Sequence, residues 1–361
     1  MKLLERALRG DVAAATLARD CCHEKLHTGD WNAVDVVWRD AYTLAVLQLL
    51  KRCSEASVEE RGRAADLAVL LGGPLWRGEV DEAIERLSTE ARVKRRRAGV
   101  TVEPLPLLGL VPSTGLASVP PGAGVGGLPR YELPSLDAFA RECFQPRAPA
   151  VLLGVLDGWP ALTRWRDLHY LIDVAGERTV PIEVGAHYLA DGWNQQLMPL
   201  ERFLRTCIHA ADSADSRGYL AQHDVFEQAP ALRRDFTAPD YVCLGGDELR
   251  ACNAWLGPAG TVTPPHTDPH HNLLCQVVGV KHARLYAPQH GAALYPHAAP
   301  PFTNSSRVDA FAPDDVRFPR FAGAPFVDVD LQPGEVLYIP PGWWHTLVAR
   351  TSSFSVSFWW G

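Results

Sequence analysis

Two short segments carry side chains that can bind a metal ion. In Pro264-Pro265-His266-Thr267-Asp268, the histidine and the aspartate occupy positions i and i+2. In extended backbone, side chains two residues apart point to the same side. The second segment, residues 334–345 (GEVLYIPPGWWH), begins in a Pro-Gly turn at residues 333–334. A five-residue strand and a second tight turn that presents His345 are predicted to follow.

The spacing G-x5-P-x-G-x2-H of the second segment resembles the second motif of the cupin superfamily, small double-stranded β-helices that hold a metal at the barrel mouth. This resemblance implies that His345 is a metal ligand, and His266 and Asp268 then complete a set of two imidazoles and one carboxylate. Such a set occupies one face of an octahedral iron and leaves three positions open, whereas a structural zinc site uses four protein ligands. An aspartate where cupins commonly carry a second histidine favours a non-haem Fe(II) oxygenase over storage proteins and isomerases.

Lys281 is the candidate partner for a cosubstrate. In the stretch KHARLYAP it shares one strand face with Ala283 and Leu285. A lysine on an apolar face fits a side chain that points into a barrel to meet a buried anion, such as the distal carboxylate of a metal-bound 2-oxo acid. The alternative is an edge lysine whose alkyl stem covers apolar surface.

Three longer stretches are similar to the Jumonji C (JmjC) family of Fe(II)- and 2-oxoglutarate-dependent oxygenases: NAWLGPAGTVTPPHTDPHHNLLCQVVGVKHARLYAP, ALYPH, and PGEVLYIPPGWWH followed by SFSVSFWWG. Within that family they look closest to the branch called lysine demethylase 8, also described as an arginyl hydroxylase, and the similarity covers about residues 128–361. The resemblance implies that the iron is bound, and catalysis carried, by His266, Asp268 and His345. It implies that 2-oxoglutarate is contacted by Lys281, Tyr219, Thr263 and Asn272, and a substrate arginine by Glu183 and Trp255.

Some of these positions also have a purely structural interpretation. A guanidinium needs a buried carboxylate and an aromatic face, but Glu183 in TVPIEVG is equally compatible with an outward-facing strand position. Trp255 alone is typical of a core residue. The remaining histidines are interpreted as surface or barrel-wall residues because the three-ligand set is complete without them; they include His223, His270, His271, His282 and His290.

The resemblance implies a dioxygenase that uses Fe(II), 2-oxoglutarate and O2 to hydroxylate a protein side chain, with arginine preferred. The alternative within the family is demethylation of histone N-methyl-lysine, whose methylammonium needs an aromatic or oxygen-lined cage without a tight ion pair. A third hypothesis, from another class, is a non-catalytic cupin-like binding protein that acts through its helical region. The expected partner is a protein or a histone tail.

The expected architecture is α+β: a helical domain over residues 1–99, a Pro/Gly-rich linker over 100–129, and a double-stranded β-helix (jelly-roll, cupin-like) oxygenase domain over 130–361. Helical periodicity resumes after a break at residues 28–30, where Asp30 is a candidate cap. Helices are also expected near 135–144, 163–176 and 198–210. Short β-branched or aromatic segments predict strands over residues 150–160, 179–185, 253–256, 261–263, 272–278, 281–287, 335–339 and 353–360.

Composition narrows the class of protein. Of 361 residues, 47% are hydrophobic and 21% charged, which excludes wholesale disorder, and the net charge of -7 gives no reason to expect direct nucleic-acid binding. The eight cysteines include no C-x-x-C pair, so they are interpreted as reduced structural residues. The sequence shows neither a membrane span nor an apolar secretory signal, which predicts a soluble protein of the nucleus and/or cytoplasm.

Two further features leave alternatives open. The basic run Lys94-Arg95-Arg96-Arg97 fits either a nuclear localisation signal or cations at the end of a helix. The sequence ends at Gly361, directly after the last predicted strand, without the C-terminal helices through which some JmjC enzymes dimerise, so we expect a monomer.

Overall fold

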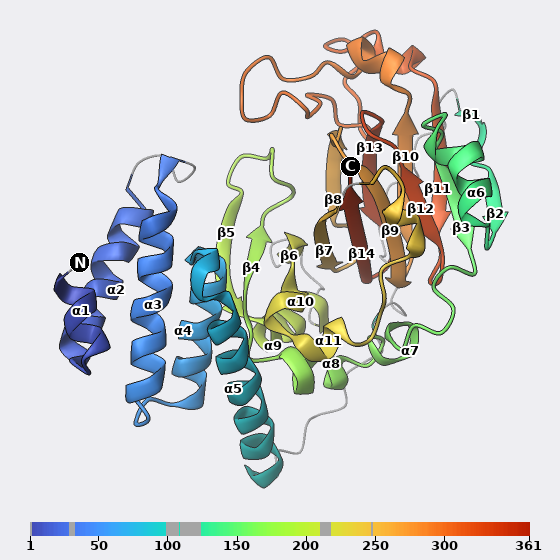
Figure 1. The fold of residues 1–361 in the computed structure, drawn as a ribbon. Helices are drawn as coiled ribbons and strands as arrows, with labels where there is room; N and C mark the ends of the chain where they lie inside the picture. The colour runs from blue at the N-terminus through green and yellow to red at the C-terminus, as the bar shows by residue number, and fades with distance from the viewer. Residues whose placement is uncertain (1, 29–32, 99–107, 109–123, 210–217, 247) are drawn as a thin grey trace.

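The computed structural model describes residues 2–28, 33–98, 108, 124–209, 218–246 and 248–361. Figure 1 shows two parts, a group of helices formed by the N-terminal residues and a β-barrel formed by the C-terminal half, with strands β4 and β5 lying between them. No helix among the described residues is both long enough and apolar enough to cross a membrane.

The N-terminal part consists of antiparallel helices with a small core. Its elements are α1 (Lys2–Leu8), α2 (Val12–Leu26), α3 (Val36–Arg52), α4 (Val58–Leu71), the short 3-10 helix η2 (Pro74–Trp76) and α5 (Arg77–Ala98). Asp35 caps α3, and a reciprocal capping box between Ser57 and Glu60 starts α4. The predicted cap Asp30 lies outside the described residues, and the helix begins only at Val36.

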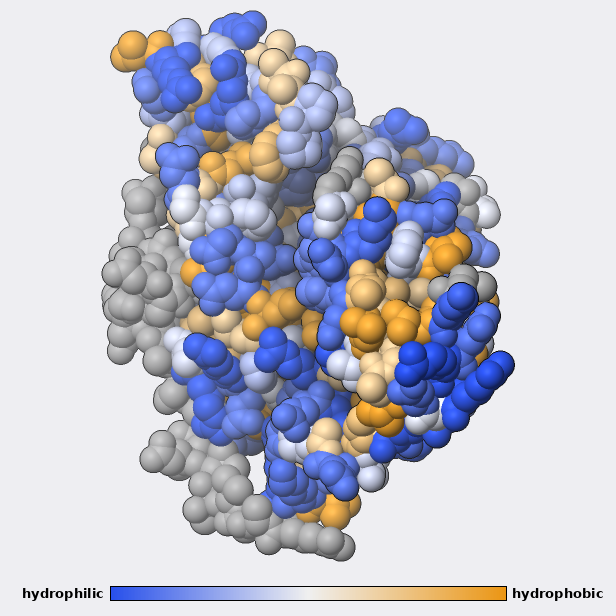
Figure 2. All heavy atoms as spheres, turned by 90° about the vertical axis from the view of Figure 1, so that its left-hand side faces the viewer, coloured by the Kyte–Doolittle hydropathy of each residue, from blue (hydrophilic) through white to orange (hydrophobic). Residues whose placement is uncertain are grey.

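The helices bury mainly small and aliphatic side chains against one another, such as Val46, Ala65 and Ile84. Larger apolar residues remain exposed on their outer surface, among them Leu17, Val37 and Trp38. Figure 2 views this side of the molecule, where hydrophobic residues occur in small groups between hydrophilic ones.

Most of the predicted linker lies outside the described residues. Leu108 is buried, and its backbone N–H donates to the carbonyl of Arg166 at 2.8 Å. Residues 124–127 form strand β1 (Gly124–Gly127), which pairs in parallel with β11 (Phe326–Leu331). The end of the predicted linker is therefore part of the barrel.

Two sheets form the barrel, and from β7 onward consecutive strands largely alternate between them. The five-stranded sheet has the order β1-β11-β10-β13-β8, and the nine-stranded sheet the order β2-β3-β12-β9-β14-β7-β6-β4-β5. The eight strands β7 to β14 make the jelly-roll, which confirms the predicted cupin-like fold. Their bounds are β7 (Leu249–Gly257), β8 (Val262–His266), β9 (His271–Val278), β10 (Lys281–Tyr286), β11 as above, β12 (Val336–Ile339), β13 (Trp344–Ala349) and β14 (Ser353–Trp360).

Additional strands and helices extend the large sheet and cover its outer face. The strands are β2 (Arg130–Glu132), β3 (Ala150–Leu153), β4 (Thr179–Val184), β5 (Asn194–Pro199) and β6 (Gly218–His223). The helices are α6 (Leu136–Phe139) with η3 (Ala140–Phe144), α7 (Ala161–Arg164), α8 (Leu168–Ala175), α9 (Leu200–Phe203) with η4 (Leu204–His209), α10 (Val225–Gln228), α11 (Pro230–Arg233) and η6 (Asp240–Cys243). The 3-10 helices η7 (Pro288–Leu294) and η8 (Phe321–Gly323) lie in the long connection between β10 and β11.

Side-chain alternation divides each central strand between two cores. On β9, Leu273 and Cys275 pack outward against the helices, whereas Leu274 packs into the barrel. Such strands are buried on both faces and therefore read as continuous apolar runs.

The strand predictions were partly right. The segment predicted over residues 150–160 is a strand only as far as Leu153, and six strands were not predicted: β1, β2, β5, β6, β11 and β13. The other predicted strands are present with shifted ends.

Candidate functional site

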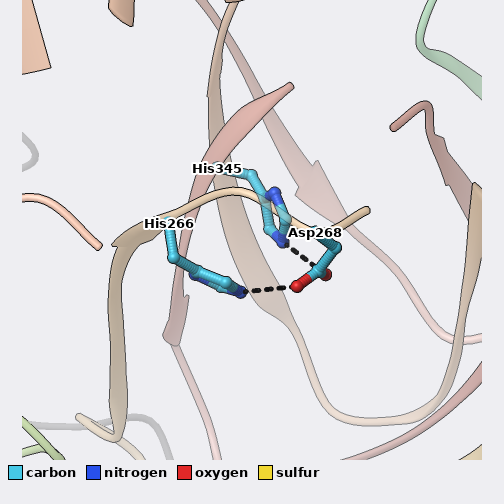
Figure 3. A group of neighbouring side chains, drawn as sticks. All are labelled: His266, Asp268 and His345. Atoms are coloured by element: carbon cyan, nitrogen blue, oxygen red, sulfur yellow. Dashed lines mark ion pairs between the residues drawn. The ribbon is translucent and has the colours of Figure 1, made fainter. Parts of the chain in front are cut away.

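Three side chains meet at one end of the barrel, as Figure 3 shows: His266 at the end of β8, Asp268 two residues later, and His345 on β13. They come together because β8 and β13 are antiparallel neighbours whose register places His345 opposite His266. His266 Nε2 lies 3.8 Å from Asp268 Oδ1, and His345 Nε2 lies 3.5 Å from Asp268 Oδ2. One donor atom from each residue falls within 4.8 Å of the others, which is close enough for one metal ion.

Backbone carbonyls orient both imidazoles. His266 Nδ1 lies 2.9 Å from the carbonyl of Pro264, and His345 Nδ1 lies 3.0 Å from the carbonyl of Trp343. If each Nδ1 donates its proton to that carbonyl, each Nε2 presents a lone pair toward Asp268. The glycine of the second motif also contributes, because the N–H of Gly342 donates to the carbonyl of Asp268 at 2.9 Å.

The electrostatics favour the protonation states of metal ligands. Burial, together with the neighbouring His345, lowers the pKa of His266 to about 4, so this imidazole is neutral at physiological pH. Burial by itself would raise the pKa of Asp268, but hydrogen bonding and charge from the two histidines outweigh it and the pKa is lowered. A neutral imidazole and an ionised carboxylate are the ligand forms.

Lys281 points into the barrel, as its strand face predicted. It is 3% exposed, and its face-mates Ala283 and Leu285 pack in the interior with Leu274 and Leu337. Burial lowers the pKa of Lys281 to about 7, and no carboxylate of the described residues forms an ion pair with it. Its Nζ lies 5.9 Å from the centre of the Tyr219 ring.

The other three predicted cosubstrate contacts lie on strands of the same interior. The Tyr219 hydroxyl is hydrogen-bonded to the side chain of Thr263 on β8, and burial raises its pKa. Asn272 on β9 lies on the same strand face as the interior residue Leu274. Its side-chain oxygen Oδ1 is buried and has no hydrogen-bond partner among the described residues, and such a group calls for a ligand or an ordered water.

A cavity of about 430 Å³ adjoins the three metal-binding candidates and contains both predicted substrate residues, Glu183 and Trp255. Burial raises the pKa of Glu183, which is hydrogen-bonded to the Trp193 side chain and forms no ion pair with a described cation. The Trp255 indole donates to Ser357 Oγ at 2.8 Å, so its ring is held in place. The ambiguity about the strand face of Glu183 is thereby resolved, because this carboxylate faces the cavity.

Several aromatic residues of the cavity were not identified from the sequence: Tyr188, Trp193, Phe302 and Trp359. The first three lie in loops, where no periodicity indicates which side chains face inward. The sequence could have indicated that Trp359 faces inward. Alternation along SFSVSFWW places it on the other strand face from Phe358 and Trp360, which pack in the outer core. The adjacent histidines are not ligands: His271 is hydrogen-bonded to the Tyr338 hydroxyl at 2.8 Å, and His270 contacts the carbonyl of Gly361.

Comparison with known proteins identifies the family. Residues 136–361 match the model of the cupin-like domain, and residues 1–100 match that of the KDM8-like N-terminal ARM repeats. The chain is 39% identical to Lysine-specific demethylase JMJ30 of Arabidopsis thaliana, over 98% of this chain and 87% of that protein. It is 40% identical to Jumonji C domain-containing protein 5 of Drosophila melanogaster (93% and 84%) and 38% identical to Lysine-specific demethylase 8 of Danio rerio (96% and 86%).

The chain belongs to the JmjC family of cupin-like oxygenases. As a JmjC protein it is an Fe(II)- and 2-oxoglutarate-dependent dioxygenase, which confirms the predicted enzyme class and cofactors and argues against a non-catalytic binding protein. The demethylase names of its relatives favour the alternative hypothesis, lysine demethylation, over the preferred arginine hydroxylation. A protein substrate agrees with both.

Proposed function

We propose that this JmjC protein binds Fe(II) through His266, Asp268 and His345 and uses it to oxidise a cationic side chain of a protein. The observation that carries the proposal is the buried His-Asp-His group beside an aromatic cavity that contains a carboxylate with no ion pair to any described cation. The donor set fits the metal, since two neutral imidazoles and one carboxylate are the ligands that a non-haem Fe(II) oxygenase uses.

The barrel interior fits 2-oxoglutarate. Lys281 offers a buried amine that has no counter-ion among the described residues, and the unsatisfied Oδ1 of Asn272 and the hydroxyls of Tyr219 and Thr263 add polar groups. When both groups are bound, the iron and 2-oxoglutarate supply oxidation of a C–H bond by O2, with 2-oxoglutarate converted to succinate and CO2. The protein's own contribution is to position Lys281, which becomes charged beside the distal carboxylate, and to keep water out.

We propose N-methyl-lysine as the first substrate class. The cavity walls include Tyr188, Trp193, Tyr219 and Trp255, and aromatic faces bind methylammonium groups through cation–π attraction. Oxidation of an N-methyl group would release it as formaldehyde. The names of the relatives from Arabidopsis thaliana and Danio rerio, both lysine-specific demethylases, support this choice.

Arginine hydroxylation is the second candidate, and one specific observation favours it. Glu183 is a largely buried carboxylate that faces the cavity and has no cationic partner among the residues that the structure describes. A guanidinium matches a carboxylate with two parallel N–H donors and also stacks on aromatic rings.

Mass spectrometry separates the two substrate classes. We would incubate the purified protein, Fe(II) and 2-oxoglutarate with peptides that carry either methyl-lysine or arginine. Loss of 14 mass units per methyl group, with formaldehyde, identifies the demethylase, and a gain of 16 on arginine identifies the hydroxylase. If neither peptides nor a whole proteome stimulate succinate formation, and His345→Ala leaves the succinate background unchanged, the proposed oxygenase function is wrong.

A further inference from the structure

We infer that the helical region takes part in substrate binding, with Asp66 on α4 as a positioning residue for the strand pair that carries Glu183 and Tyr219. This inference rests on the proposed substrate cavity. It assigns to the helical region a role in the geometry of the cavity, beyond that of a packed appendage or a docking module.

Asp66 links the helical region to Thr179, the first residue of β4, through a hydrogen bond. Its side chain is fully buried, and its Oδ2 accepts a hydrogen bond from the backbone N–H of Thr179 at 2.7 Å. Its Oδ1 lies 3.4 Å from Nη1 of Arg178, which is also buried. Burying a charged pair costs desolvation energy, so such a pair is poor evidence for stability but does fix geometry.

A second contact holds the same residue of β4 from the barrel side. Gln228 at the end of α10 donates through Nε2 to the carbonyl of Thr179 at 3.0 Å. Its Oε1 lies 2.7 Å from Nε2 of His223, the last residue of β6. Both backbone polar groups of Thr179 are thus held by side chains, one from each part of the protein.

The fixed end of β4 leads directly to the cavity. β4 and β6 are antiparallel, and their register places Glu183 opposite Tyr219 at the cavity end. Thr179 and His223 lie at the far ends of these two strands, four residues from Glu183 and Tyr219 respectively. Because β4 is paired with β5 along its whole length, a shift or rotation at Thr179 is transmitted along β4 to Glu183 and, through the pairing at that end, to Tyr219.

Other contacts between the two parts lie on the same side of the barrel. Arg95 on α5 donates to the carbonyl of Ile172 at 2.6 Å and forms ion pairs with Glu177 and Glu201. Arg77, at the start of α5, pairs with Glu227 on α10. The helical region therefore docks on the segments that lead into and flank β4, and Figure 1 shows α4 and α5 beside this strand.

The test variant is Asp66→Asn, which keeps the size of the side chain and an acceptor for Thr179 but removes the charge that faces Arg178. We expect the dissociation constant of a fluorescently labelled methyl-lysine or arginine peptide, measured by anisotropy, to rise about tenfold, as for loss of a supporting residue. The affinity for Mn(II) should change less than about twofold, because the metal ligands lie on or beside other strands, β8 and β13. The KM for 2-oxoglutarate and the succinate background without peptide should change less than the peptide dissociation constant does, because Tyr219 is the one predicted 2-oxoglutarate contact that lies on β6.

Arg61→Gln is the matched control, because Arg61 lies on the same helix but pairs with Glu90 of α5 inside the helical region. Arg61→Gln should lower the stability of the helical region without changing the dissociation constant of the peptide. If Asp66→Asn does not fold, Gly62→Ala serves instead: the added methyl would lie 3.1 Å from Nη2 of Arg178, while alanine favours the helix more than glycine does.

Unchanged peptide affinity in the folded variants would overturn the inference, and so would an equal loss of peptide, 2-oxoglutarate and metal binding. A wild-type protein that oxidises no peptide would instead count against the proposed function. Anisotropy records binding without turnover and keeps the two outcomes distinct.

Discussion

Replacing Lys281 by methionine should stabilise the protein in the absence of 2-oxoglutarate and abolish the response to 2-oxoglutarate. The side chain is 3% exposed, and burial lowers its pKa from the ordinary value of 10.5 to about 7. Because the folded state binds this proton less tightly than the unfolded chain does, stability rises with pH between about 7 and 10.5 and is lost as the pH falls toward 7.

The size of the effect follows from the same pKa. With one pKa unit equal to about 1.36 kcal/mol, burying Lys281 costs about 4 kcal/mol at pH 7.5 and about 2 kcal/mol at pH 9. Lys281→Met removes this cost and keeps a similar volume, so urea unfolding without ligand should show a gain of that order, larger at pH 7.5 than at pH 9. Lys94→Met is the control, since Lys94 is an exposed partner of Glu59.

Cosubstrate binding supplies the second measurement. A carboxylate beside Lys281 restores the charged form, so at pH 7.5 the wild-type protein should take up roughly 0.8 proton when 2-oxoglutarate binds. Calorimetry in buffers of different ionisation enthalpy measures this uptake, and Lys281→Met should show neither uptake nor tight binding. If the variant is less stable at both pH values, or binds 2-oxoglutarate like the wild type, then Lys281 is not the buried partner of the cosubstrate.

The remaining predictions concern the substrate pocket, the metal and the core. Glu183→Gln should raise the peptide dissociation constant about thirtyfold or more, because loss of a buried charged hydrogen bond costs roughly 2–5 kcal/mol, while the KM for 2-oxoglutarate stays unchanged; equal peptide dissociation constants would contradict the assignment. His345→Ala should lower Mn(II) affinity by at least about tenfold in titrations, whereas His270→Ala should not, and similar affinities would refute the ligand set. Phe354→Ala removes a fully buried ring that stacks on Trp165, and it should lower the free energy of unfolding in urea by about 3–5 kcal/mol. Val316→Ala, at a position 94% exposed, should lower it by less than about 0.5 kcal/mol. Equal losses would show that the two positions do not differ as their burial implies.

The residues of the site that could be predicted are those fixed by local geometry. His266 and Asp268 share a side because they are two residues apart in an extended segment, and strand alternation placed Lys281 inside the barrel. The pairing of His345 with His266 depends on strand register, which no local pattern specifies. For that step the prediction used family resemblance.

The features that could not be predicted depend on contacts between distant segments. β11 was missed because the polar residues in FVDVDL resemble a loop, although Asp328 and Asp330 pair with Arg284 and His282 of β10. Asp66 in VEERGRAADLAVLL looks like any charged residue of a surface helix, and only the packing of α4 against β4 shows that it is buried. A charged residue such as Asp66 cannot be assigned to the surface from its sequence neighbours when its partner, Arg178, is 112 residues away along the chain.

On strands β10 and β14, the outward face packs against other parts of the protein and the inward face carries residues of the predicted binding sites. One short segment can therefore contribute to both stability and ligand binding. On β10 the inward residue Lys281 has no anionic partner among the described residues. The next residue, His282, points outward, and its Nδ1 lies 2.7 Å from Oδ1 of Asp330. On β14, Phe358 packs against the outer core while Trp359 faces the cavity. A substitution of Phe358 should therefore act first on folding, and a substitution of Trp359 should act first on ligand binding. Adjacent pairs such as Phe358 and Trp359 consequently separate the two effects within one strand, because they share a backbone but not an environment.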